Sequence, residues 1–188
     1  SAMEKGYDEF SLMNNILGGT FLSRLNMNLR EDKHWSYGAG SGIDPVKGPA
    51  IFSASAGVQT DKTKESIQEF IKELTQINSS RPVAPDEFTK EQSSVILSLP
   101  GDWQTNNGIM WFLQSCMTFN RGLDYPNNYS TIIQNLTLAD IQQSAAKIVK
   151  PQNLTWLIVG DRQKIETGIR ELNLGPLKIL DTDGREVK

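Results

Sequence analysis

The sequence of 188 residues has few of the side chains that build metal centres and covalent frameworks, because it contains one cysteine and one histidine. The lone Cys116 excludes an internal disulfide framework. A catalytic zinc needs about three protein ligands drawn from His, Cys, Asp and Glu. Glu31 and His34 lie three residues apart and supply at most two. We therefore expect no metal and no cofactor in this chain, and His34 in a solvated turn.

Two further absences limit the partners. No apolar run approaches the ~18 residues of a membrane-spanning helix, so no membrane span is expected. The chain has 19 Lys and Arg against 22 Asp and Glu, a formal net charge of −3 and no basic block. These features argue against nucleic acid and anionic membrane as partners. No internal repeat or low-complexity linker interrupts the chain, and its 38% apolar content suits one domain with a real core.

The pattern from residue 7 to residue 32 predicts a helix. Apolar residues recur there at every fourth position: Leu17, Phe21, Leu25 and Leu29. Gly18 and Gly19 lie in the middle of this helix, where each glycine costs roughly 1 kcal/mol relative to alanine. Such a pair indicates close packing against a neighbouring element or, alternatively, a hinge.

Residues 35 to 41 and 49 to 59 are predicted to form a β-hairpin. Small and apolar residues alternate along the second run, as expected for a sheet with two unequal faces: Phe52, Ala54, Ala56 and Val58. The turn between the runs contains Pro45 and Gly48, two residues that favour tight turns. Glycines in the first strand leave room for another backbone to approach.

Helices are predicted after the hairpin over residues 61 to 77, 85 to 99, 102 to 118, 138 to 149 and 162 to 172, with a short one through residue 133. Pro100 is expected to end the second of them. The next helix carries an apolar stripe that we expect to be core, with Cys116 an inert thiol on its buried face: Trp103, Met110, Leu113 and Met117. The apolar run at residues 153 to 159 predicts a strand covered on both faces. This order predicts an α+β fold, an antiparallel sheet covered by several helices.

The stretch N-x-I-L-G-G-x-F-x-S-R-L-x-x-x-L-R-E at residues 14 to 31, followed by Tyr37-Gly38, resembles the pitrilysin/insulinase-type zinc metallopeptidases, which include the mitochondrial processing peptidases. Later residues fall in the family's order, among them Pro85 and the Val-Gly-Asp triplet ending at Asp161. The family's zinc motif, His-x-x-Glu-His, is absent. The chain is therefore most similar to the half of those enzymes that holds no zinc.

The resemblance gives Arg30 and Tyr37 a substrate-binding role. In the family, an arginine and a tyrosine seven residues apart face the zinc across a closed chamber and hold the substrate backbone and the scissile carbonyl. A guanidinium and a phenol can both donate hydrogen bonds to a carbonyl that gains negative charge. The residues alone leave a structural role open for Arg30, which lies where a helix dipole favours a cation.

The function that the resemblance implies is that of a non-catalytic domain. It completes the substrate chamber of a zinc metalloendopeptidase and binds the peptide that a zinc-bearing partner domain or subunit hydrolyses, so zinc is expected only in the partner. The alternative is a non-peptidase scaffold of the same fold, like the core subunits of respiratory complexes. The chain is expected to be inactive alone in either case.

The resemblance also sets the expected domain bounds. Family members have strands before the N-terminal helix, so residues 4 to 180 are expected to form a single inactive peptidase-like domain that lacks its first strands. Residues 1 to 3 match an expression scar, and residues 181 to 188 are expected to be a frayed tail. An open sheet edge invites self-association. The compartment stays open between the bacterial cytoplasm and periplasm.

Overall fold

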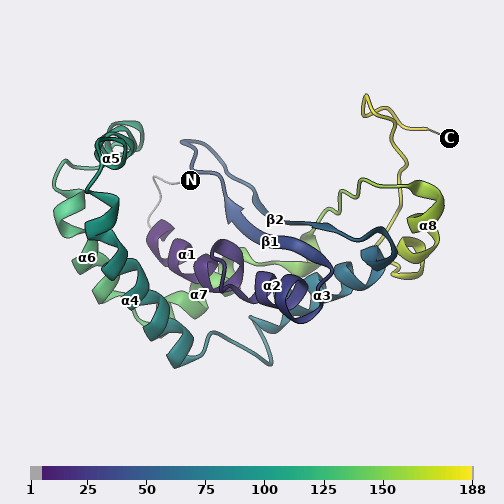
Figure 1. Ribbon diagram of the computed structural model, residues 1–188, viewed down its shortest axis with the longest axis horizontal. Helices are drawn as coiled ribbons and strands as arrows, with labels where there is room; N and C mark the ends of the chain where they lie inside the picture. The colour runs from purple at the N-terminus through teal and green to yellow at the C-terminus, as the bar shows by residue number, and fades with distance from the viewer. Residues whose placement is uncertain (1–5, 188) are drawn as a thin grey trace.

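A two-stranded antiparallel sheet lies over a layer of helices in the computed structural model, which describes residues 6–187 (Figure 1). Strand β1 (Ser36–Ile43) pairs with β2 (Phe52–Val58), as the hairpin prediction requires. The helices below the sheet in Figure 1 include α1 (Tyr7–Asn14), α3 (Thr63–Gln76) and α7 (Leu138–Ile148). The predicted α+β class is confirmed.

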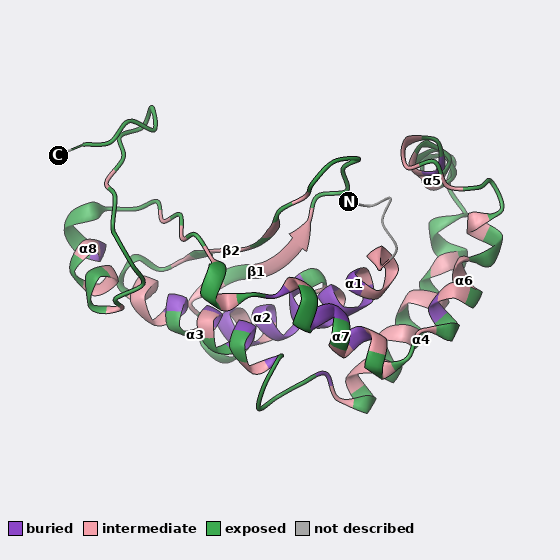
Figure 2. Ribbon diagram, turned by 180° about the vertical axis from the view of Figure 1, so that it is seen from behind, coloured by how far each residue is buried: buried purple, intermediate pink, exposed green. Residues whose placement is uncertain are grey.

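The core lies between these helices and the inner face of the hairpin. Its buried members come chiefly from the N-terminal helical segment, α3 and α7 (Figure 2), and include Leu12, Met13, Leu17, Leu25, Leu29, Leu74, Ile77, Ile141 and Val149. Ala39 and Ile43 of β1 pack against this cluster, together with Phe52 and Ala54 of β2. The apolar side chains at alternate positions of the strands therefore form the face of the sheet that packs against the core.

The N-terminal helical segment is broken, so the prediction of one continuous helix is wrong at its middle. The π-helix η1 (Asn15–Gly19) follows α1, and α2 (Arg24–Asn26) leads into a second π-helix, η2 (Met27–Asp32). Thr20 between them has extended dihedrals, φ −125° and ψ 167°. Its hydroxyl donates to the Asn15 carbonyl over 3.0 Å, a local bond that competes with the helix.

Three further helices extend to one side of the sheet, and we call them the arm: α4 (Pro85–Asp102), α5 (Asn106–Thr118) and α6 (Tyr125–Asn135) (Figure 1). Pro100 does not end its helix as predicted, because it lies in the last turn of α4. A proline that close to the end removes only one helical hydrogen bond.

The prediction that the stripe on the next helix is core is also wrong. Its four members are exposed in the described structure: Trp103, Met110, Leu113 and Met117. Cys116 is buried, as predicted. A helical stripe predicts that a face is apolar, but it does not predict which element covers that face.

Residues 153 to 159 do not form the predicted strand. Within residues 6–187 the sheet holds β1 and β2 alone, and the run passes from the 3₁₀ turn η4 (Pro151–Asn153) to α8 (Arg162–Glu171) without entering a ladder. Leu154 and Trp156 pack against the core, whereas Leu157 is 82% exposed and Val159 is 91% exposed. One face of the run is therefore covered, not two.

Residues 1 to 3, predicted to be an expression scar, lie outside the described residues. Near the other end, a single bridge joins Leu180 to Glu186. Across residues 6–187, none of the helices combines the length and the apolar character needed to cross a membrane.

Candidate functional site

Arg30 lies on η2, the helical turn that ends just before the sheet begins. Its side chain is partly exposed, and its Nε lies 3.2 Å from Glu31 Oε1. Its Cζ lies over the ring of Phe21, 4.6 Å from the ring centroid. An exposed ion pair of this kind contributes little to stability. The aromatic ring and the neighbouring carboxylate together hold the guanidinium at the surface.

Tyr37 is presented by a β-bulge. Ser36 pairs with Val58 and Ala39 pairs with Ala56, so two residues of β1, Tyr37 and Gly38, oppose one residue of β2. Trp35, Ala39 and Ile43 pack against the core. Unbroken alternation would therefore direct Tyr37 inward, yet its side chain is 97% exposed. The bulge turns this side chain to the open face of the sheet.

The hydroxyl of Ser36 closes the bulge. It lies 2.7 Å from the Gly38 carbonyl and 2.8 Å from the Gly57 carbonyl, and it accepts a hydrogen bond from Gly38 N–H at 3.0 Å. These bonds replace the ladder bonds that the extra residue interrupts. The orientation of Tyr37 is thus set by its neighbours on both strands.

A short turn joins the two candidate residues. His34 has φ 58°, the left-handed conformation that ends a helix, and Trp35 N–H donates to the Leu29 carbonyl over 3.0 Å. The ring nitrogen Nδ1 of His34 lies 3.1 Å from the Arg30 carbonyl. Arg30, on η2, and Tyr37, on β1, therefore flank one tight turn.

Asn26 ties this turn to the helical break. Its side chain is buried, its Nδ2 donates to the Phe21 carbonyl over 2.7 Å, and its Oδ1 accepts from Ala39 N–H over 3.1 Å. The side-chain amide of Asn26 therefore links Phe21, whose ring lies against the Arg30 guanidinium, to β1, the strand that carries Tyr37. Only its position inside the motif distinguished Asn26 in the sequence, and sequence reasoning missed it.

Gly18 lies where the helical segment approaches β1 most closely. A Cβ atom at this position would lie 2.3 Å from Ser41 Oγ and 2.5 Å from the Ser41 backbone nitrogen. Next to it, Asn14 Nδ2 donates to the Ser41 carbonyl over 2.8 Å. At the exposed Gly19, a Cβ would meet the side-chain ends of Asn14 and Asn15, each at 2.8 Å. The geometry of Gly18 supports close packing.

A partly buried ion pair holds the N-terminal segment to the arm. Arg24 Nε and Nη2 donate to the two carboxylate oxygens of Glu87 over 2.8 and 2.5 Å, and Arg24 also donates to the Arg81 and Pro82 carbonyls. Burial alone would raise the pKa of Glu87. The hydrogen bonds from Arg24 and from Ala84 N–H outweigh burial and hold that pKa below its usual value.

The described residues do not fit a metal. Nowhere in residues 6–187 do three or more His, Cys, Asp or Glu side chains cluster in a way that could hold one. His34 and Glu31 are both exposed, and His34 directs a ring nitrogen toward a carbonyl.

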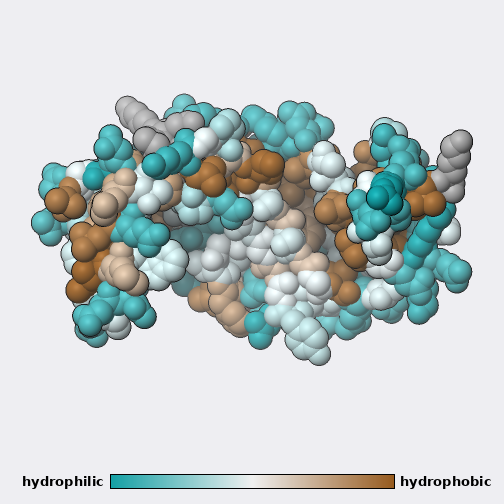
Figure 3. Space-filling model, turned by 90° about the horizontal axis from the view of Figure 1, so that it is seen from above, coloured by the Kyte–Doolittle hydropathy of each residue, from teal (hydrophilic) through white to brown (hydrophobic). Residues whose placement is uncertain are grey.

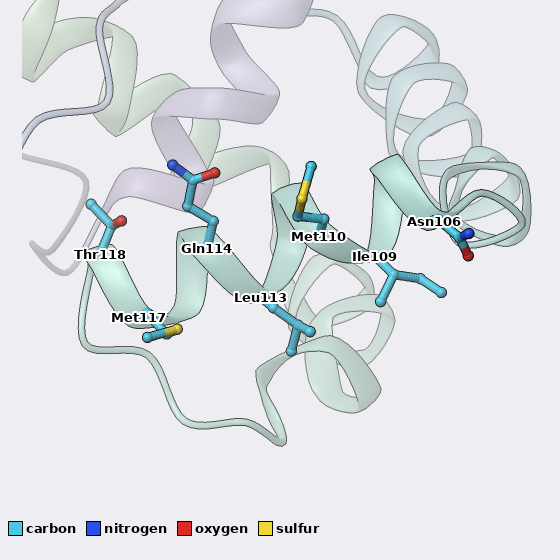
Figure 4. A pocket seen from close by; sticks show the side chains of 7 residues that line it. All are labelled: Asn106, Ile109, Met110, Leu113, Gln114, Met117 and Thr118. Carbon is cyan, nitrogen blue, oxygen red and sulfur yellow. The ribbon is translucent and has the colours of Figure 1, made fainter.

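Two of the hollows on the described part of the surface differ in chemistry. One of about 480 Å³ runs along α5 and is lined by that helix alone, mostly by apolar side chains (Figure 4). The other, of about 260 Å³, is polar and is lined by charged residues that include Arg24, Lys72 and Glu87. Neither is lined by Arg30 or Tyr37. Tyr37 is 97% exposed and Arg30 is partly exposed, so the candidate site lies on an open surface of the described chain.

Solved structures share this fold. The similar chains include a peptidase M16 inactive domain from Pseudomonas fluorescens (TM-score 0.70, 21% identity, 79% of this chain and 35% of that one). A protease from Helicobacter pylori gives a TM-score of 0.70 at 17% identity, over 79% of this chain and 36% of that one. The inactive peptidase domain of a candidate zinc protease from Bordetella parapertussis gives a TM-score of 0.64 at 16% identity, over 82% of this chain and 84% of that one.

These identities establish the fold alone, and this chain spans about a third of the length of the first two structures. No curated protein sequence matches it. The family model described as the peptidase M16 inactive domain matches residues 2–107, more than half of the 188 residues. The chain therefore belongs to the peptidase M16 inactive-domain family.

Proposed function

We propose that this domain completes the substrate chamber of a zinc metallopeptidase and binds the substrate peptide for a zinc-bearing partner domain or subunit. The observation that carries the proposal is the bulge that turns Tyr37 out of the core and onto an open sheet face. Figure 3 shows side chains of near-neutral hydropathy over the middle of that side of the molecule, with hydrophobic groups flanking them. Such a surface suits peptides of varied sequence.

In this proposal Arg30 and Tyr37 donate hydrogen bonds to the substrate. The Tyr37 hydroxyl and the Arg30 guanidinium reach the peptide backbone and the scissile carbonyl, which gains negative charge as it is attacked. The Arg30 fork offers two parallel donors, a geometry that a lysine cannot reproduce. The zinc and the general base belong to the partner.

The isolated chain should bind no stoichiometric zinc and cleave no peptide, because its described residues offer no cluster of ligands. Metal analysis after dialysis and a panel of fluorogenic peptides measure both properties. One tightly held zinc per chain, with cleavage that a chelator abolishes, would overturn the proposal.

Substitutions in the assembled peptidase test the donors directly. Tyr37→Phe and Arg30→Ala should each lower kcat by about 10²–10³-fold, the cost of losing one oxyanion donor, with zinc content and Tm unchanged. Arg30→Lys should restore little of the activity that Arg30→Ala loses, because an ammonium group does not reproduce the geometry of the guanidinium. Arg162→Ala is the matched control for Arg30→Ala, since Arg162 is an exposed arginine of α8 whose Nε also pairs with a glutamate, Glu166, over 2.5 Å.

A scaffold is the second candidate function, and the exposed face of α5 favours it. This helix has no charged residue and presents several apolar side chains to solvent: Ile109, Met110, Trp111, Leu113 and Met117. Exposed patches of this kind mark interaction surfaces. Wild-type turnover in both Tyr37→Phe and Arg30→Ala would make the scaffold the leading candidate.

A further inference from the structure

We infer that Phe21 is a positioning residue for Arg30, and that Asn26 keeps this pair in register with Tyr37. The inference rests on the proposed function and adds to it the residues that place the two donors. It follows from three observations: the break in the N-terminal helical segment, the ring under the guanidinium, and the buried amide between the break and the strand.

The break removes Phe21 from the core. Leu17, Leu25 and Leu29 of the same four-residue repeat are fully buried, whereas Phe21 is 55% exposed. Thr20 and Ser23, which flank the break, both have extended dihedrals. Burying a phenylalanine side chain is strongly favourable, so the placement of Phe21 at the surface forgoes a sizeable stabilisation.

At the surface the ring meets the Arg30 guanidinium. The centroid distance of 4.6 Å is well inside the ~6 Å limit of a cation–π contact. The ion-pair partner of this guanidinium, Glu31, is exposed and next to it in sequence, so it restricts the side chain little. The flat ring therefore limits the orientations that the guanidinium plane adopts before a substrate arrives.

Asn26 extends this order to Tyr37. It spans from the Phe21 carbonyl (2.7 Å) to Ala39 N–H (3.1 Å), and Ala39 is the first regularly paired residue after the bulge. Asn26 is buried, so loss of either bond would leave a polar group unpaired. The contacts of Asn26 therefore fix the position of Phe21 and Arg30 relative to the strand that carries Tyr37.

The first test uses the isolated chain and needs no activity. In a ¹H–¹⁵N spectrum, the Nε–Hε resonance of Arg30, assigned by its loss in Arg30→Lys, should be displaced by the ring current of Phe21. Phe21→Leu should move it toward the position of a solvent-exposed arginine, and Phe21→Tyr should leave it in place. Leu22→Ala, at the neighbouring exposed position, is the control. An unmoved resonance in Phe21→Leu would overturn the inference.

The second test uses the assembled peptidase. Phe21→Leu should lower kcat by about 2- to 5-fold with little change in KM, the size expected for an exposed cation–π contact, and Phe21→Tyr should restore it. In an Arg30→Ala background Phe21→Leu should have no further effect, whereas a merely structural role would give independent losses. If Arg30→Ala is itself at the wild-type rate, the proposed function fails. If Arg30→Ala is impaired and Phe21→Leu is not, the positioning role alone fails.

Discussion

The body of the molecule and its arm use similar sequence patterns and reach different packing. In the body, the helical segment, α3 and α7 bury their apolar stripes under the hairpin, and Leu12, Leu17 and Leu29 are almost completely inaccessible. In the arm, α5 carries a comparable stripe, yet Cys116 is its one buried residue in the described structure and Met117 is 80% exposed. The comparison teaches that amphipathic patterning needs a facing element before it becomes a core.

Polar contacts join the two regions, beside the apolar packing of Phe88 and Val95 of α4 against the core. Asn15 Nδ2 donates to Glu91 on α4 over 3.0 Å, and the Tyr125 hydroxyl on α6 donates to Asp8 on α1 over 2.9 Å. Burial raises the pKa of Tyr125, and it raises the pKa of the nearby Tyr129 to about 12. Both phenols therefore stay protonated at neutral pH, which Tyr125 requires in order to donate to Asp8.

Gly18→Ala should produce the largest effect. The added Cβ would lie 2.5 Å from a backbone nitrogen of β1, which cannot move without shifting the sheet. We expect a loss of more than about 3 kcal/mol, at the upper end for overpacking, measured by urea unfolding. Gly101→Ala in the arm is the matched control, because a Cβ there meets nothing within 4 Å, and it should stabilise α4 slightly. Equal stability of Gly18→Ala and wild type would favour a hinge at this position.

Leucine truncations compare the two stripes directly. Leu17→Ala in the body should cost about 3 kcal/mol, as for other buried leucines. Leu113→Ala in the arm should cost less than about 1 kcal/mol, since that side chain is already exposed. Thermal and chemical unfolding measure both. Similar costs for the two variants would mean that the face of α5 is covered in solution, and the contrast between body and arm would then be wrong.

Glu87→Gln should weaken the contact between Arg24 and α4 that links body and arm. We expect the free energy of unfolding to fall by about 1.5–3 kcal/mol at neutral pH, the value of hydrogen bonds to a charged group. The folded-state pKa of Glu87 is lowered, so its carboxylate stabilises the fold above the ordinary glutamate pKa. That contribution is lost as the pH falls through the folded-state pKa. Unfolding curves of wild type and variant should therefore converge in acid. A constant difference at every pH would exclude this linkage.

The smallest effect on stability is expected for a substitution in residues 154 to 159, the extended run that pairs with no strand of the described sheet. Within residues 6–187, residues 154 to 159 donate and accept no backbone–backbone hydrogen bond, and their open edge should support self-association. Leu157→Lys should change the free energy of unfolding by less than about 0.5 kcal/mol but reduce the mass seen by light scattering. A monomeric wild type at all concentrations would contradict this prediction.

The sequence by itself determined most of the local elements and the family. The four-residue repeat predicted a helical segment, the alternation from Phe52 to Val58 predicted the hairpin, and the motif around Arg30 pointed to the peptidase family. These signals are short in range, because helix and strand periods are set by residues a few positions apart. They also nominated Arg30 and Tyr37, whose roles stay predictions.

Only the tertiary structure decided how those residues are presented. The bulge that turns Tyr37 outward depends on the pairing of β1 with β2, and the Asn26 bridge depends on contact between the helical segment and β1. The exposure of α5 and the unpaired run at residues 154 to 159 depend in the same way on which elements lie opposite. Periodicity assigns a residue to a face, but packing between distant segments decides whether that face is covered, strained or left open.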